Sequence, residues 1–242
     1  GGFDAQDAKL MSDAANNYLR RLPQDKEYFV RANTDGTMRA FLSDKYAPID
    51  NRWFLDTIEE LVPEGRLSHW RSDEDTMYGN VLIPETIMDK PDGDSDYGGM
   101  LSLGNCEIGK RKASTLPSIF RAICLNGCIW GSVSGTAYKR RHVGTIDLDA
   151  LKAGIASNLT AQLPLLPTAI DALLDTRRFT TSAVPLKNVI GIVSKDHKLS
   201  AGEASKVAEE FRTYESAHRS LFGIVHAITR AGQKGSNERW VA

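Results

Sequence analysis

The 242-residue chain lacks the features of several protein classes. It has no apolar run that approaches the roughly 18 to 20 residues needed to span a bilayer. Residues 1–4 show neither the basic nor the apolar region of a signal peptide, so none is predicted. Three cysteines are too few, and odd in number, for a secreted disulfide framework. We therefore expect a soluble protein with no membrane partner, located in the cytoplasm.

Signatures of metals, cofactors and hydrolytic nucleophiles are also missing. Cys124 and Cys128 are four positions apart, but no second Cys/His pair follows at zinc-finger spacing. Residues 92–96 alternate like the start of a calcium loop, yet Leu103 stands at its twelfth position, where glutamate is needed. The chain has no Walker loop and no Gly-x-Ser-x-Gly elbow. We expect no cofactor and no metal, and a non-enzymatic role is favoured over catalysis.

Charge is nearly balanced over the whole chain, at −1, but it is distributed unevenly. Residues 51–100 hold 4 Lys/Arg and 12 Asp/Glu, whereas residues 101–150 hold 7 and 3. Such asymmetry is typical of a protein with one nucleic-acid face, of subunits that stack acidic on basic, or of solvated faces without a partner. The basic segment at residues 104–142 is the strongest candidate for a working surface.

The first half of the chain shows hairpin and helix signals. Apolar residues around an Asp-Gly turn predict one hairpin over residues 29–42. A second hairpin is expected around the acidic tip at residues 72–75. Asp50 is expected to cap a helix that spans residues 52–62. The segment 118–124 is expected to be helical.

Helices are expected at both ends of the chain. Residues 4–21 carry apolar side chains at helical spacing. A long helical region is predicted over residues 147–177, with Pro164 and Pro167 marking a kink or break. Ser200 and Glu203 form a capping box that opens a further helix.

These signals predict an α+β fold. Antiparallel hairpins pack with helices in the N-terminal part, and the C-terminal part is helical. We expect a mixed core domain over residues 27–180 and a helical segment over residues 181–242 that packs on it.

The densest cluster of cations lies beside two glycines. Gly104 and Gly109 allow close backbone turns, and three cations in a row follow them. Glycine turns beside lysine and arginine suit phosphate contacts, although an exposed basic turn without a ligand is the alternative. The residues expected to contact nucleic acid are Lys110, Arg111, Lys112, Arg121, Lys139, Arg140, Arg141, Arg31 and Arg39.

Two other functions remain open from the residues alone. A metal-dependent nuclease would use Glu107 with an acidic loop, but the Glu-x-Lys spacing of restriction-type nucleases is off by one at Lys110. A structural protein, or one that binds a host protein, would need no nucleic-acid surface. Cleavage in the presence of Mg²⁺ or Mn²⁺ distinguishes the first of these, and capture of a host partner distinguishes the second.

Four segments resemble a phage and plasmid family known only as domain of unknown function 932. They are residues 39–46 (RAFLSDKY), 104–109 (GNCEIG), 120–127 (FRAICLNG) and 220–230 (SLFGIVHAITR). The resemblance covers roughly residues 27–242, and the family's members look like products of mobile elements. The order of a strand-rich half followed by helices is similar in outline to phage single-strand annealing proteins, whose hairpins and helix build oligomeric rings around a basic groove. The resemblance implies a bacteriophage protein that binds and anneals single-stranded DNA in recombination, as an oligomer in the host cytoplasm.

Overall fold

The computed structural model describes residues 5–23, 27–73, 75–89, 93, 96–122, 128–132, 137–216 and 219–233. The chain forms two compact units, Gly1–Tyr46 and Ala47–Ala242, and each is described by itself. Antiparallel sheets and helices are both present, and the C-terminal part is helical, so the predicted α+β class is confirmed.

The first unit holds one helix and one hairpin. Helix α1 covers Ala5–Arg20, and strands β1 (Tyr28–Ala32) and β2 (Met38–Ser43) pair antiparallel. Gly36 has a φ of 83°, which favours glycine, and this conformation closes the turn between the strands. The helix and the hairpin that the sequence predicted here are confirmed.

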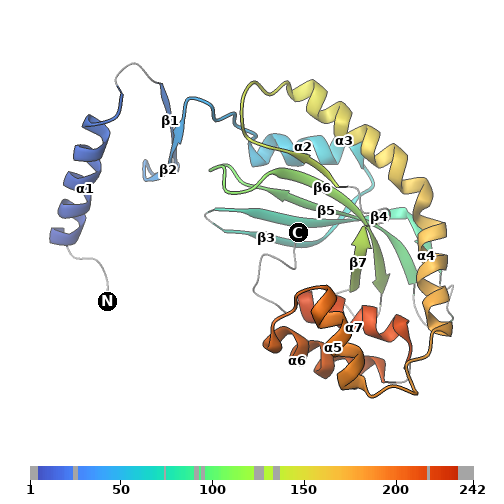
Figure 1. Ribbon diagram of the computed structural model, residues 1–242. Helices are drawn as coiled ribbons and strands as arrows, with labels where there is room; N and C mark the ends of the chain where they lie inside the picture. The colour runs from blue at the N-terminus through green and yellow to red at the C-terminus, as the bar shows by residue number, and fades with distance from the viewer. Residues whose placement is uncertain are drawn as a thin grey trace. The chain divides into compact units, whose positions relative to one another are not determined.

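The second unit is built on a six-stranded antiparallel sheet (Figure 1). Five strands follow one another in the order of the sequence, and the sixth, β8, pairs with the beginning of β6. The strands are β3 (Arg66–Ser72), β4 (Met77–Met88), β5 (Asp96–Asn105), β6 (Ala113–Ala122), β7 (Cys128–Ser132) and β8 (Tyr138–Arg140).

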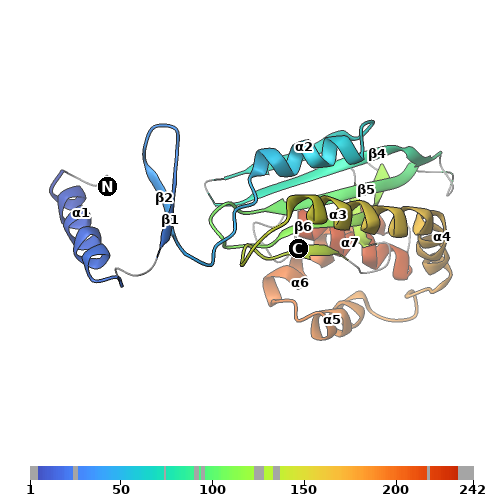
Figure 2. The same cartoon turned by 90° about the horizontal axis from the view of Figure 1, so that it is seen from above.

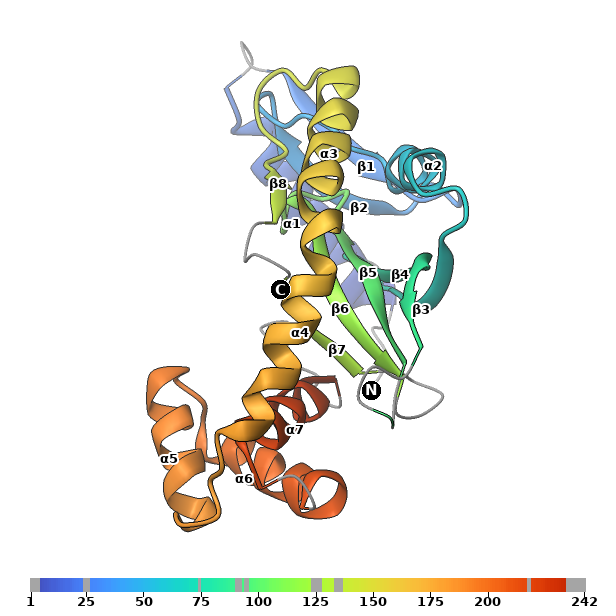
Figure 3. The same cartoon turned by 90° about the vertical axis from the view of Figure 1, so that its right-hand side faces the viewer.

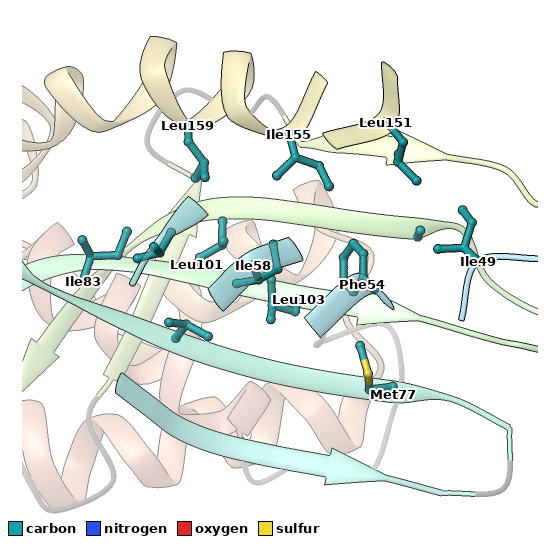
Figure 4. Packing of buried hydrophobic residues seen from close by; sticks show 13 residues of the cluster. Ile49, Phe54, Ile58, Met77, Ile83, Leu101, Leu103, Leu151, Ile155 and Leu159 are labelled. Atoms are coloured by element: carbon teal, nitrogen blue, oxygen red, sulfur yellow. The ribbon is translucent and has the colours of Figure 1, made fainter. Parts of the chain in front are cut away.

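Helices α2 (Asn51–Leu61) and α3 (Leu148–Gln162) cover one face of this sheet (Figures 2 and 3). Their apolar residues pack on alternate residues of the strands, because successive side chains of a strand point to opposite faces. Figure 4 shows this core from close by. Its largest buried members are Ile49, Phe54, Ile58, Met77, Ile83, Leu101, Leu103, Leu151, Ile155 and Leu159.

Helix α4 (Leu166–Asp175) continues this covering toward the far end of the same face. It packs with Tyr97 and Ile119 in a second cluster. A Cβ on Gly99 would lie 2.5 Å from Leu166 Cδ1, so a glycine at this position lets the helix approach the sheet closely. The break predicted at the prolines is confirmed, since a short 3-10 turn at Leu163–Leu165 separates α3 from α4.

The chain ends in a group of helices with an apolar cluster of its own. The group contains α5 (Leu186–Asp196), α6 (Ala201–Glu210), a π-helical turn (Phe211–Glu215) and α7 (Leu221–Gln233). The predicted capping box is confirmed, because the Ser200 backbone N–H donates to Glu203 and the Glu203 N–H donates to the serine hydroxyl. In the described part of the chain, no helix is both long enough and apolar enough to cross a bilayer.

The helix predicted over residues 118–124 is wrong for the part of it that the structure describes. Residues up to Ala122 belong to β6, which pairs with β5 over its whole length from Ser114. Ile119 and Arg121 point to the face that the helices cover. Ser118 and Phe120 alternate with them along the strand and therefore point to the opposite face. The remaining residues, 123 and 124, lie outside the described part.

Candidate functional site

The pairing of β8 with β6 brings the two basic runs of the sequence together. Arg140 lies opposite Ala113, and Lys139 lies opposite Ser114. The turn that leads into β6 carries the first basic run, and the second lies on β8 and the residue directly after it. We call these six cations the basic surface: Lys110, Arg111, Lys112, Lys139, Arg140 and Arg141.

Helix α3 fixes the position of β8. The ring of Tyr138 packs against the main core. A Cβ on Gly154 of α3 would lie 2.5 Å from Cε2 of this ring, so only glycine admits it without a shift. The helix and the short strand are therefore in direct contact, and this contact holds the second basic run in place.

The turn between β5 and β6 is held by hydrogen bonds to Cys106. The buried Cys106 thiol accepts a hydrogen bond from the Lys110 backbone N–H at 3.2 Å. The Cys106 carbonyl accepts one from the Gly109 N–H at 3.3 Å. Gly109 has a φ of 78°, which favours glycine, as the sequence indicated. Gly104, by contrast, lies within β5 and takes no part in the turn.

Two residues of the same segment bind the beginning of α2. The amide nitrogen of the buried Asn105 donates to the Ile49 carbonyl and to Asn51 Oδ1, each at 2.9 Å. Glu107 Oε1 accepts from the Asn51 backbone N–H at 2.8 Å. Asp50, the expected cap, makes no capping hydrogen bond with its side chain. The carboxylate at the positive end of α2 therefore comes from Glu107.

Replacing Glu107 by alanine is expected to lower the free energy of unfolding by about 1 kcal/mol, the usual value of a helix-capping side chain. Chemical denaturation of the variant and the wild type measures this difference. Glu59→Ala, on the exposed side of the same helix, is the matched control and should change stability by less than about 0.5 kcal/mol. Equal effects of the two substitutions would contradict the capping role.

Three cations of the basic surface make contacts within the unit. Lys110 pairs with Asp75 at the tip of the β3–β4 hairpin, and the hydrogen bond with this carboxylate is the main cause that raises the pKa of Lys110. The Arg111 guanidinium donates to the Tyr78 hydroxyl and lies 4.5 Å from the centre of its ring. Arg140 donates to the Thr145 carbonyl at 3.0 Å.

The other three cations point to solvent. Lys112, Lys139 and Arg141 are exposed. Within the described ranges, no carboxylate forms an ion pair with any of them. Their charges are therefore available to an anionic partner.

Arg121 does not belong to the basic surface. It lies at the far end of β6, eight positions beyond Ala113 and thus roughly 27 Å away along the strand. Its side chain is 4% exposed and faces the helices, where its guanidinium lies 4.8 Å from the Phe222 ring centre. The expectation that Arg121 contacts a phosphate from this surface is corrected accordingly.

Arg121 is part of a buried ion-pair cluster that sequence reasoning missed. Arg230 Nη2 lies 2.9 Å from Glu215 Oε1, and Arg230 Nε lies 3.7 Å from Glu210 Oε2. Arg121 Nη1 is 4.0 Å from the same oxygen of Glu215. The four side chains come from β6, the end of α6, the π-helical turn and α7. Two positive and two negative charges balance in the interior, as burial of charge requires.

The π-helical turn aligns the two glutamates of this cluster. In an α-helix, residues five apart point about 140° away from one another. The wider π turn closes its hydrogen bonds over five residues and brings Glu210 and Glu215 to one side. Both carboxylates can then face Arg230.

Arg31 and Arg39 lie on the hairpin of the first unit. Arg31 on β1 pairs with Ala40 on β2, and Arg39 directly precedes Ala40 in the sequence. Their expected contribution to a common nucleic-acid groove stays a prediction.

The acidic loops show no metal site in the described ranges, where no group of three potential ligands is found. Asp73 instead closes the β3–β4 turn by accepting hydrogen bonds from the Thr76 N–H at 2.7 Å and the Asp75 N–H at 2.9 Å. These bonds, that of Thr76 first, lower the pKa of Asp73. Residues 92 and 94 of the calcium-like loop lie outside the described part.

Comparisons with known proteins do not indicate a function for this chain, so its function is inferred from its sequence and its structure. The resemblance to the family of domain of unknown function 932 rests on the four sequence segments and stays a prediction. No protein-family model, no curated protein and no solved structure matches the chain.

Proposed function

We propose that this protein binds single-stranded DNA through the basic surface, without catalysis. In this proposal it is a bacteriophage protein that anneals strands during recombination and acts as an oligomer. The resemblance described above supports the phage origin, the single-stranded ligand and the oligomeric state. In this proposal the acidic segment at residues 51–100 meets the basic face of a neighbouring subunit.

The observation that carries the proposal is the pairing of β8 with β6. It gathers cations from two distant stretches of sequence at one end of one sheet. Three of them are exposed and have no carboxylate partner within the described ranges. Phosphate contacts from lysine and arginine supply most of the affinity of sequence-independent DNA binding.

The nuclease alternative is less well supported. Its proposed ligand, Glu107, accepts a hydrogen bond from the first turn of α2, and the rest of the turn contains no second carboxylate. This alternative is tested by incubating DNA with the purified protein and Mg²⁺ or Mn²⁺, and a result without cleavage would exclude it.

A variant without the three exposed cations that lack a carboxylate partner within the described ranges, Lys112→Ala, Lys139→Ala and Arg141→Ala, should bind a fluorescent oligothymidine more weakly. If each cation meets one phosphate, the slope of log binding constant against log salt should become shallower by about 2, since each contact on a single strand contributes about 0.7. Fluorescence anisotropy over a range of salt concentrations measures both quantities.

The control removes the same number of charges from the C-terminal helices. Lys187, Lys195 and Lys206 are exposed and lie on α5 and α6, so their replacement by alanine changes net charge equally. The proposal predicts a near-normal slope for this control. Equal slopes for the wild type and both triple variants would contradict it. A specific host protein captured after nuclease treatment, with no DNA affinity, would favour the host-interaction alternative.

A further inference from the structure

One row of residues crosses the sheet on the face opposite α2 and α3. Register places Arg71 opposite Tyr78, Tyr78 opposite Gly104, Gly104 opposite Ser114, and Ser114 opposite Lys139. Four strand-to-strand steps of about 4.8 Å give this row a length of about 19 Å. We call these five residues the outer row.

Alternation along the strands assigns the outer row to its face. Met77 and Leu103, the sequence neighbours of Tyr78 and Gly104, belong to the core under the helices. Because successive side chains of a strand point to opposite faces, the outer row faces away from that core. Its two ends, Arg71 and Lys139, are exposed.

The floor near the outer row is mostly polar. The adjacent row contains His69, Asn80 and Ser102, in register with one another, and it continues to Leu116 on β6. Asn80, Ser102 and Ser114 are each half-buried, so they are accessible from this face. Farther from the basic surface the same face becomes apolar, with Met100, Leu82 and Phe120. The polar end of the face therefore coincides with the basic surface.

Tyr78 stands in the outer row with a guanidinium upon it. The Arg111 Cζ atom lies 4.5 Å from the ring centre, and the guanidinium also donates to the phenol oxygen. Only 8% of Tyr78 is exposed, and the Arg111 guanidinium lies over its ring. Both an aromatic ring and a guanidinium are planar groups on which nucleic-acid bases stack.

We propose that a single strand of nucleic acid crosses this face along the outer row, with one base stacked on the Arg111–Tyr78 pair. Arg71 and Lys139 contact phosphates on the two sides of that base, and the glycine between Tyr78 and Ser114 leaves room for the chain. Stacking requires a base face that is not already covered in a duplex, so the ligand is single-stranded. This inference rests on the proposed function. It adds Tyr78 and Arg71 to the binding residues and gives the path of the nucleic acid across the sheet.

The stacking part is tested with Tyr78→Leu and Tyr78→Phe. Loss of one stacked base should weaken oligothymidine binding by about 5- to 100-fold in Tyr78→Leu, whereas Tyr78→Phe keeps most of the affinity. Tyr78→Leu should not change the affinity for an abasic strand of equal length, nor the salt slope. Equal affinity of Tyr78→Leu and the wild type for oligothymidine would overturn the inference.

The strand path is tested by charge reversal on β3, where exposed substitutions leave the core intact. Arg71→Glu lies in the outer row, and Arg66→Glu lies on the same strand, opposite Leu82. We expect Arg71→Glu to weaken binding at least several-fold more than Arg66→Glu. Equal effects would overturn the path. If Tyr78→Leu and Arg71→Glu bind normally while the Lys112/Lys139/Arg141→Ala variant has a shallower salt slope, only this inference is rejected. If the wild type does not bind single-stranded DNA, the proposed function itself is rejected.

Discussion

Replacing Glu215 by alanine is expected to lower the free energy of unfolding by about 3–5 kcal/mol. Glu215 is 2% exposed and neutralises Arg230 at 2.9 Å and Arg121 at 4.0 Å. Its removal leaves two guanidinium groups in the interior with a single carboxylate, that of Glu210, beside Arg230. Breaking a buried ion pair by removing one partner carries a cost of this size, because the remaining charge stays desolvated.

Denaturant unfolding of the second unit's helices and sheet measures this effect. Glu209→Ala, an exposed position one residue before Glu210 on α6, is the matched control and should change stability by less than about 0.5 kcal/mol. The double variant Glu215→Ala, Arg230→Met should lose less stability than the sum of its single variants, since methionine removes one unpaired charge. A Glu215→Ala variant as stable as the control would show that the cluster contributes nothing to stability.

Replacing Phe54 by alanine is expected to lower the free energy of unfolding by about 3–5 kcal/mol, the usual range for a large buried aromatic side chain. Phe54 is 1% exposed and projects from α2 into the core between the helices and the sheet (Figure 4). Its removal takes away apolar contacts and leaves a cavity that the surrounding strands cannot fill completely. Thermal or denaturant unfolding measures the loss.

Arg52→Ala is the matched control for this position. Arg52 is exposed on the same helix and pairs with Asp56 at 3.0 Å, so its loss should cost about 0.5 kcal/mol or less. The beginning of α2 also binds Asn105 and Glu107, which precede Lys110 in the sequence. Under conditions where the second unit stays folded, Phe54→Ala should leave the proposed DNA binding unchanged. A Phe54→Ala variant that unfolds like Arg52→Ala would contradict the assignment of this core.

The cations in and around β6 fall into two groups, the basic surface and the buried ion-pair cluster. The cations of the basic surface lie in the turn before β6 and on or directly after β8, where three of them contact neighbouring groups and three point to solvent. Arg121 at the end of β6 is held among Phe222, Tyr97 and Glu215. Arg121 is the one cation within β6, and it is buried because its side chain faces the helices that cover one face of the sheet.

Burial of Arg121 also explains the wrong secondary-structure prediction for residues 118–124. Strand alternation is recognised by apolar residues at every second position, and here a charged residue occupies an inward one. Arginine is rarely buried unless it is paired. The partner, Glu215, lies far along the chain on the π-helical turn, so nothing near Arg121 signals its burial.

Local sequence alone determined the elements whose stabilising groups are neighbours in the chain. The Ser200–Glu203 capping box, the Asp-Gly turn of the first hairpin and the proline break after α3 involve residues at most a few positions apart. Such signals do not depend on the rest of the fold. The α+β class and the two basic runs could be predicted for the same reason.

Tertiary structure decided which of these cations act together. The pairing of β8 with β6, the outer row and the buried ion-pair cluster each join residues that are distant in sequence. Whether a cation faces solvent or a carboxylate depends on which helices cover which face of the sheet, and that follows from packing the whole apolar core. The basic character of residues 104–142 was therefore a property of the sequence, and its separation into an exposed surface and a buried cluster a property of the fold.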